Sequence, residues 1–141
     1  MTASVRPFAS VLERLKGVGL RPTRQRLALL RLLQGGGDRH LTAEDLHEEA
    51  RGAGIKVSLA TVYNTLHQFT EAGLLREVVV EAGRSYFDTN TSAHHHFLHE
   101  ETGALIDIAP DLVRVGELPS PPQGTAIARV DVIVRVTSGN R

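Results

Sequence analysis

Apolar residues recur every three or four positions through the first half of the chain, which is the spacing of helices with one buried face. The last three of these runs begin at a Ser or Thr that can cap a helix, and each run ends at glycines. The four predicted helices occupy about residues 8–15, 23–34, 42–51 and 58–72.

The fourth predicted helix has the clearest signals. Ser58 is placed to cap its start, and Gly73 stands where a helix stop is expected. The apolar residues of one face are Leu59, Val62, Leu66 and Phe69. The polar residues of the opposite face are Thr61, Asn64, Gln68 and Glu71. This amphipathic pattern leaves a polar helix surface for a partner.

A β-hairpin is predicted next. Residues 74–80 have the pattern of a strand, Ala82 and Gly83 form a turn, and residues 84–88 form the partner strand. Three short helices, a longer helix and a hairpin are the elements of a winged-helix DNA-binding domain, which we place at residues 1–88. In that architecture the helix after Ser58 enters the major groove, and the hairpin lies along a phosphate backbone.

The charge of the chain is uneven. Residues 1–40 carry eight basic and two acidic side chains, a net charge of +6, whereas residues 77–141 have a net charge of −4. Phosphates attract Arg and Lys, and bases are recognised by groups on the groove-facing helix. The alternatives are chance clustering of surface charge and, for Tyr63, packing under the hairpin. The predicted DNA-binding residues are Arg21, Arg24, Arg26, Ser58, Thr61, Tyr63 and Asn64.

The small polar segment 89–93 is predicted as a hinge, followed by a second domain at residues 94–141. Its predicted elements are strands at 94–100 and 104–108, a short helix at 110–115, an extended connector at 119–122 and a strand at 127–136. About fifty residues bury little apolar surface alone, so we expect this domain to form a homodimer. The predicted fold class is α+β, with a winged-helix domain followed by a small α/β dimerisation domain.

Composition excludes several classes of site. The chain has no Cys, which rules out disulfides, thiolate zinc sites and a cysteine nucleophile. No run of 18 apolar residues occurs, and residues 1–10 lack the pattern of a secretory signal. We therefore expect a cytoplasmic protein without a membrane partner.

Three histidines stand in a row at His94, His95 and His96. If this segment is extended, His94 and His96 point to one face and His95 points to the other. Two imidazoles from alternate strand positions can bind one metal ion, and imidazole suits Fe, Mn, Zn, Co, Ni and Cu. The alternative is an exposed polar loop.

Four stretches resemble the ferric uptake regulator family. They are GLRPTRQRL at 19–27, LTAEDL at 41–46, SLATVYNTLHQFTEAGL at 58–74, and HHHF at 94–97 with GALID at 103–107. The resemblance implies a homodimeric transcription repressor whose metal occupancy controls binding to a double-stranded DNA operator. It implies Fe(II) or Mn(II) at the regulatory site, with Zn(II) as a substitute in vitro. The implied ligands are His40, Asp88, His94, His96 and Asp107.

The chain also departs from most of that family. The positions of the first Cys-x-x-Cys pair hold His99 and Thr102, so we expect no structural zinc of the four-cysteine type. The three adjacent histidines, Asn64 and the segments 116–124 and 128–136 are most similar to the haem-responsive iron response regulator branch. That likeness implies that His94, His95 and His96 bind haem and that a haem-delivering protein is a partner.

The same donors fit other functions. A peroxide-sensing Fe- or Mn-dependent repressor would oxidise a ligand histidine such as His40 or His94. A small metalloenzyme would activate oxygen with two histidines and one carboxylate, but its basic winged helix would then have no role. A repressor without an effector is the remaining alternative. We predict an iron- or haem-responsive regulator of iron or haem homeostasis genes, and not an enzyme.

Overall fold

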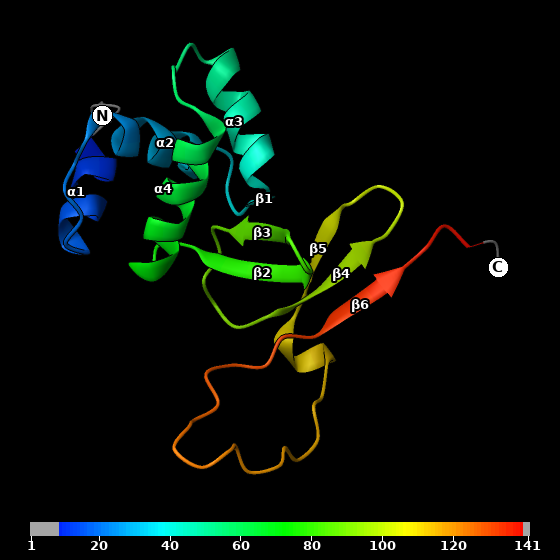
Figure 1. The fold of residues 1–141 in the computed structure, drawn as a ribbon. Coiled ribbons are helices and arrows are strands. Elements are labelled where there is room, and N and C mark those ends of the chain that lie inside the picture. The colour runs from blue at the N-terminus through cyan, green and yellow to red at the C-terminus, as the bar shows by residue number, and fades with distance from the viewer. Residues whose placement is uncertain (1–8, 140–141) are drawn as a thin grey trace, which may run out of the picture. The chain divides into compact units, whose positions relative to one another are not determined.

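The computed structural model describes residues 9–139, which form parts of two compact units (Figure 1). One unit ends at Thr91, and the other begins at Ser92. This boundary lies within the segment 89–93, whose role as a hinge stays a prediction. Among the described residues, no helix has both the length and the apolar character needed to cross a membrane.

Capping side chains begin the last three helices of the first unit, as the sequence predicts. Thr23 and Ser58 each accept a hydrogen bond from the backbone N–H three residues later. Thr42 and Asp45 form a reciprocal capping box. These caps satisfy N–H groups that have no partner within the helix. Phe8, predicted in the first helix, lies outside the described residues. The helices are α1 (Ala9–Gly17), α2 (Arg24–Gln34), α3 (Ala43–Gly52) and α4 (Leu59–Glu71).

The helices of the first unit enclose an apolar core. The predicted buried stripe of α4 is confirmed at Val62, Leu66 and Phe69, each fully buried. The prediction is wrong at Leu59, which is 39 % exposed. Leu59 lies in the first turn at the edge of the stripe, and Thr65 occupies the buried row instead. Other core residues include Val11, Leu15, Leu29, Leu30, Leu33 and Leu46.

A three-stranded antiparallel sheet completes the first unit. Its strands are β1 (His40–Leu41), β2 (Arg76–Glu81) and β3 (Arg84–Asp88), in the order β1-β3-β2. Gly83 turns β2 into β3 with a φ of 76°, which glycine adopts without strain. The sequence does not predict β1, because two residues cannot display an alternating pattern. This short strand sets His40 directly opposite Asp88.

The second unit contains a mixed three-stranded sheet. Its strands are β4 (His95–His99), β5 (Leu105–Ile108) and β6 (Ile133–Val136), in the order β5-β4-β6. β5 runs antiparallel to β4, whereas β6 runs parallel to it. The buried apolar residues of this sheet include Leu98, Leu105 and Ile108.

Two predicted elements of the second unit are too long. The predicted helix at 110–115 is a single 3-10 turn, Pro110–Leu112. The predicted strand at 127–136 is confirmed only at Ile133–Val136. In the β4–β6 register, residues 127–131 would lie opposite residues 90–94, which precede β4, so they have no strand with which to pair. Val132 still accepts a hydrogen bond from the backbone N–H of His96 at 3.2 Å.

Replacing Thr42 by Ala should lower the free energy of unfolding by about 1 kcal/mol, because α3 loses its N-terminal cap. Replacing Thr42 by Ser keeps the hydroxyl and should preserve most of the stability. Urea denaturation of both variants, followed by circular dichroism, measures the difference. Equal stability of the Ala and Ser variants would contradict the capping role.

Candidate metal centre and nucleic-acid interface

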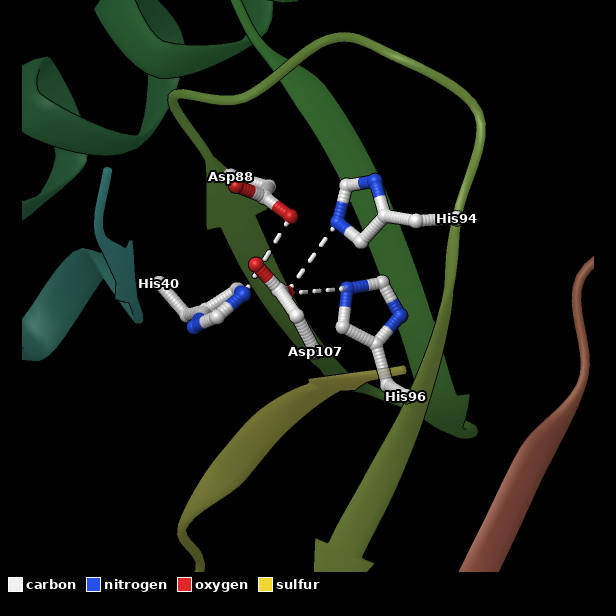
Figure 2. Close-up of side chains that lie close together, drawn as sticks. All are labelled: His40, Asp88, His94, His96 and Asp107. Carbon is white, nitrogen blue, oxygen red and sulfur yellow. Dashed lines mark ion pairs between the residues drawn. The ribbon is translucent and has the colours of Figure 1, made fainter. Parts of the chain in front are cut away.

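His94, His96 and Asp107 form a group of metal-ligand side chains in the second unit. The β4–β5 register places His96 opposite Asp107, and His94 lies two residues before His96. The Nε2 atoms of His94 and His96 lie 3.1 and 3.4 Å from Asp107 Oδ1 (Figure 2). Both imidazoles are buried. The donor atoms that these residues offer lie within 4.8 Å of one another, so one ion can contact all three.

A hydrogen bond to the backbone fixes the neutral tautomer of His94 in the form that can bind a metal through Nε2. Its Nδ1 lies 2.7 Å from the carbonyl oxygen of Ser92, which can only accept, so Nδ1 carries the proton. In the neutral ring, Nε2 then presents a lone pair to the carboxylate oxygen of Asp107. Two lone pairs at this distance require a cation between them, either a proton or a metal ion. Histidines that bind metals commonly donate their other N–H to a backbone carbonyl in this way.

His40 and Asp88 form a second group of donors, in the first unit. Nε2 of His40 lies 3.3 Å from Oδ2 of Asp88, which is fully buried. The other carboxylate oxygen accepts a hydrogen bond from the backbone N–H of Asn90 at 2.8 Å. This bond orients the carboxylate, leaving Oδ2 directed toward His40, as a supporting contact does for a metal ligand.

His95 does not join His94 and His96. Alternation along the strand turns its side chain to the other face of the sheet, as the sequence predicts. The backbone N–H of Val132 donates to His95 Nδ1 at 3.1 Å, so the proton of the neutral ring is on Nε2. Two of the three adjacent histidines therefore lie together. The third, His95, instead fixes the chain just before β6 through its hydrogen bond with Val132.

His99 and Thr102, at the positions of the implied Cys pair, belong to a hydrogen-bonded cluster. The backbone N–H of Thr102 donates to His99 Nδ1 at 3.3 Å, and His99 Nε2 lies 3.2 Å from Ser138 Oγ. Hydrogen bonds from the side chain and backbone of Ser138 hold the pKa of Glu101 below its ordinary value. Because the folded-state pKa is lowered, these bonds stabilise the fold above the ordinary pKa, and this contribution is lost as the pH falls through the folded-state value.

Four predicted DNA-binding residues line one depression on the first unit. This depression has a volume of about 370 Å³ and is formed by α4 and the chain around the start of α2. Arg24, Ser58 and Tyr63 are exposed and lie outside its lining. The lining includes Arg21, Arg26, Thr61 and Asn64, together with Gln25 and Gln68.

Arg26 makes hydrogen bonds within the unit. Its guanidinium donates to Gln68 Oε1 from Nε at 3.2 Å and from Nη2 at 3.0 Å, and to the carbonyl of Arg21 at 2.8 Å. These bonds join the start of α2 to α4. Gln68 was not among the predicted DNA-binding residues, although its position four residues after Asn64 on the polar helix face could have indicated it.

Tyr63 does not pack under the hairpin. Its side chain is 48 % exposed, and its ring centroid lies 4.5 Å from that of His67. His67 in turn contacts Phe87 of β3 edge-on, with the centroids 5.5 Å apart. The half-buried ring of His67 thus supports Tyr63 on the surface of α4.

A sequence model of the ferric uptake regulator family matches residues 17–133. The chain belongs to this family. Proteins of the ferric uptake regulator family are metal-dependent transcription regulators that bind DNA operators as dimers. Membership agrees with the observed arrangement of a winged-helix DNA-binding domain followed by a small dimerisation domain.

Related sequences and structures agree with this assignment. The ferric uptake regulation protein of Vibrio parahaemolyticus is 37 % identical over 100 residues, which cover 70 % of this chain and 67 % of the relative. The Escherichia coli protein is 36 % identical over 100 residues, covering 70 % and 68 %. The Vibrio cholerae ferric uptake regulator structure has a TM-score of 0.71 and 27 % identity, covering 89 % of this chain and 97 % of that chain. The Pseudomonas aeruginosa regulator with manganese has a TM-score of 0.68 and 28 % identity, covering 92 % and 98 %.

Proposed function

We propose that this regulator binds one Fe(II) or Mn(II) ion through the donors of both units, and that the ion controls operator binding. The observation that carries the proposal is the meeting of two buried imidazoles at one oxygen of Asp107. The ligands in the second unit are His94, His96 and Asp107, and those in the first unit are His40 and Asp88.

The short connection between the units allows the two groups of donors to reach one ion. Asp88 and His94 are six positions apart in the chain, so their Cα atoms can be at most roughly 20 Å apart. Binding one ion through both groups would favour one orientation of the DNA-binding unit relative to the dimerisation unit. An ion that binds one orientation more tightly shifts the population toward it, and linkage then makes operator affinity depend on the metal.

The donor chemistry supports Fe(II) or Mn(II). Imidazole and carboxylate ligands suit both ions, and the chain has no thiolate to favour a softer one. Zn(II) fits the same donors in vitro. The similarity to the Pseudomonas aeruginosa regulator, whose structure was solved with manganese, supports a divalent ion at this centre.

Haem has less support as the effector. The backbone N–H of Val132 donates to Nδ1 of His95, and the side chain of His95 lies on the opposite face of the sheet from those of His94 and His96. A haem-delivering partner therefore stays a prediction of the sequence, as does peroxide sensing through oxidation of His40 or His94. The metalloenzyme alternative receives no support from membership in a family of transcription regulators.

We also propose that the depression on the first unit faces DNA. Arg21 and Arg24 supply positive charge for phosphates, and Ser58 begins the helix whose polar face meets the bases. Asn64 and Tyr63 are exposed on that helix, and Thr61 lines the depression. Arg26 acts mainly by holding α2 against α4 through Gln68.

Replacing His94 and His96 together by Ala should weaken Mn(II) binding by more than about 100-fold, beyond the effect of losing one supporting contact. Operator affinity should then be the same with and without Mn(II). Replacing His95 by Ala is the matched control, because His95 lies on the other face and should leave the Mn(II) response intact. Calorimetry and operator titration measure both quantities. A Mn(II) response that survives the double replacement would remove the site assignment.

Haem and hydrogen peroxide should leave operator affinity unchanged when Mn(II) occupies the site. The wild-type chain is titrated with operator DNA in the Mn(II) form, with and without haem or peroxide. Loss of binding on haem addition would support the haem-responsive alternative. Loss of binding by the Fe(II) form with peroxide, with an added oxygen on His40 or His94 by mass spectrometry, would support peroxide sensing.

Replacing Asn64 by Ala should reduce discrimination between bases by about 1–3 kcal/mol at one operator position, because a base contact is lost. Replacing Arg24 by Ala should instead weaken binding to all sequences alike and lower the slope of affinity against salt by about one. Titrations of both variants with operator variants at several salt concentrations measure these effects. A uniform loss in the Asn64 variant would contradict its assignment to base recognition.

A further inference from the structure

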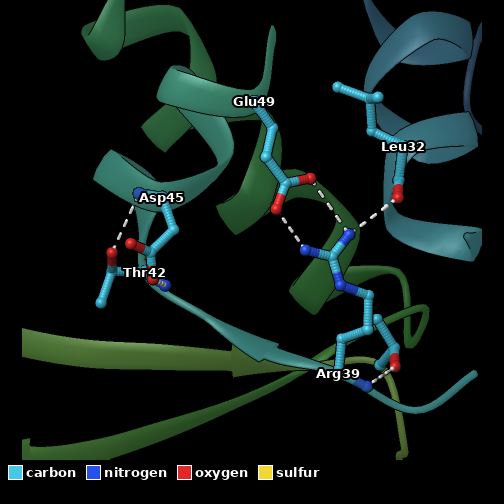
Figure 3. A network of polar contacts seen from close by, with 6 residues as sticks. Leu32, Arg39, Thr42, Asp45 and Glu49 are labelled. Carbon is cyan, nitrogen blue, oxygen red and sulfur yellow. Dashed lines mark hydrogen bonds and ion pairs between the residues drawn. The ribbon is translucent and has the colours of Figure 1, made fainter. Parts of the chain in front are cut away.

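Arg39 joins three parts of the first unit immediately before the proposed metal ligand His40. Its guanidinium donates to both carboxylate oxygens of Glu49 on α3, with Nη1 at 3.1 Å from Oε1. Nη1 also donates to the carbonyl of Leu32 near the end of α2, at 3.0 Å (Figure 3). Its backbone N–H donates to Thr89 Oγ1 at 2.8 Å, and its carbonyl accepts the backbone N–H of Thr89 at 3.0 Å.

The contacts of Arg39 are of a strong kind. A guanidinium that donates two parallel hydrogen bonds to one carboxylate is fixed in direction as well as distance. A cation at the end of a helix is also attracted by the partial negative charge of its last carbonyl groups. The side chains of Arg39 and Glu49 are only 24 % and 38 % exposed, so water screens them less than it screens an open surface pair.

These contacts confine His40 from one side, and α3 confines it from the other. Leu41 is buried, and Thr42 and Asp45 form the capping box that starts α3 (Figure 3). The Arg39–Thr89 bonds extend the pairing of His40 with Asp88 by one residue toward the segment that leaves the unit. The backbone of His40 therefore cannot move without disturbing α3 or the Arg39 contacts.

α2 connects this end of the unit to the proposed DNA surface. Its last turn accepts the hydrogen bond from Arg39, and its first turn carries Arg26, which binds Gln68 of α4. The helix has 11 residues and is about 16 Å long, so it spans the distance between these two sets of contacts.

We propose that Arg39 and Glu49 are positioning residues that transmit the effect of metal binding at His40 and Asp88 to α2, and through α2 to the DNA surface. This inference rests on the proposed metal-controlled function and adds the route within the first unit. Neither residue contacts the metal or DNA in this scheme. Their role is mechanical: when His40 moves, the Arg39 contacts move α2 and α3 with it.

Replacing Arg39 by Gln, or Glu49 by Gln, tests the inference in the full-length chain. Each variant should keep Mn(II) binding through the second unit while reducing the ratio of operator affinities with and without Mn(II) by about tenfold, since charge-assisted hydrogen bonds are lost. The double variant should lose no more than Arg39→Gln alone, because replacing Arg39 already removes its contact with Glu49 as well as its bond to Leu32. Replacing Arg39 by Lys keeps the charge without the two parallel hydrogen bonds and should give an intermediate ratio.

Glu48→Gln is the matched control. Glu48 is adjacent on α3 and pairs with Arg51, but those side chains are 74 % and 66 % exposed, and the ratio should not change. Co(II) absorption gives an independent readout, since the spectral change caused by His40→Ala should be partly reproduced in Arg39→Gln and absent in Glu48→Gln.

The outcomes separate this inference from the function on which it rests. A wild-type chain without a Mn(II) response would overturn both. A wild-type response that Arg39→Gln and Glu49→Gln retain, even with lowered thermal stability, would overturn only the inference and leave the pair a structural contact. If Arg39→Gln does not fold, Glu49→Gln decides the question alone.

Discussion

A carboxylate oxygen of Asp107 lies beside the buried Nε2 atoms of His94 and His96, and the lone pair on His94 Nε2 requires a positive charge between it and that oxygen. A proton supplies a single positive charge there. A divalent ion supplies more charge and satisfies all three atoms together. The β4–β5 register and the Ser92 carbonyl hold the donor side chains in place without an ion. Binding an ion therefore costs little side-chain entropy. The proposed metal response depends on this electrostatic requirement.

Caps, a shared core and strand pairing hold the first unit together. Each of its last three helices starts at a side-chain cap, and the buried residues of α4 join it to the common core. Its donors, His40 and Asp88, lie on paired strands and not on a free loop. A force applied at β1 therefore reaches the helices through packed side chains and directed hydrogen bonds, because a close-packed interior transmits strain.

Sequence reasoning succeeds where the signal is local. Ser58 and Thr42 cap their helices through bonds that span three residues, and His94 and His96 share a face because strands alternate with a period of two. It fails where a distant partner decides the outcome. Leu59 looks buried by spacing, but burial depends on what packs against each turn, and residues 127–131 lack a strand beside them.

The candidate site shows the same division. Residue chemistry and spacing indicate the histidine pair, whereas His40, Asp88 and Asp107 came from the family resemblance. Nothing in the sequence indicates that Arg39 meets Glu49 ten residues away and Thr89 fifty residues away. Contacts of this kind depend on how the elements pack and not on any repeating pattern.

The parallel pairing of β6 with β4 has a consequence for how the second unit is assembled. The β4–β5 hairpin closes a short loop, whereas β6 must return across residues 109–132. Closing a longer loop costs more entropy, and non-local pairing forms late. Chains emerge from the ribosome with the N-terminal end first, so β4 and β5 leave it before β6. The hairpin that carries the proposed metal ligands is thus the template on which the last strand of this unit docks.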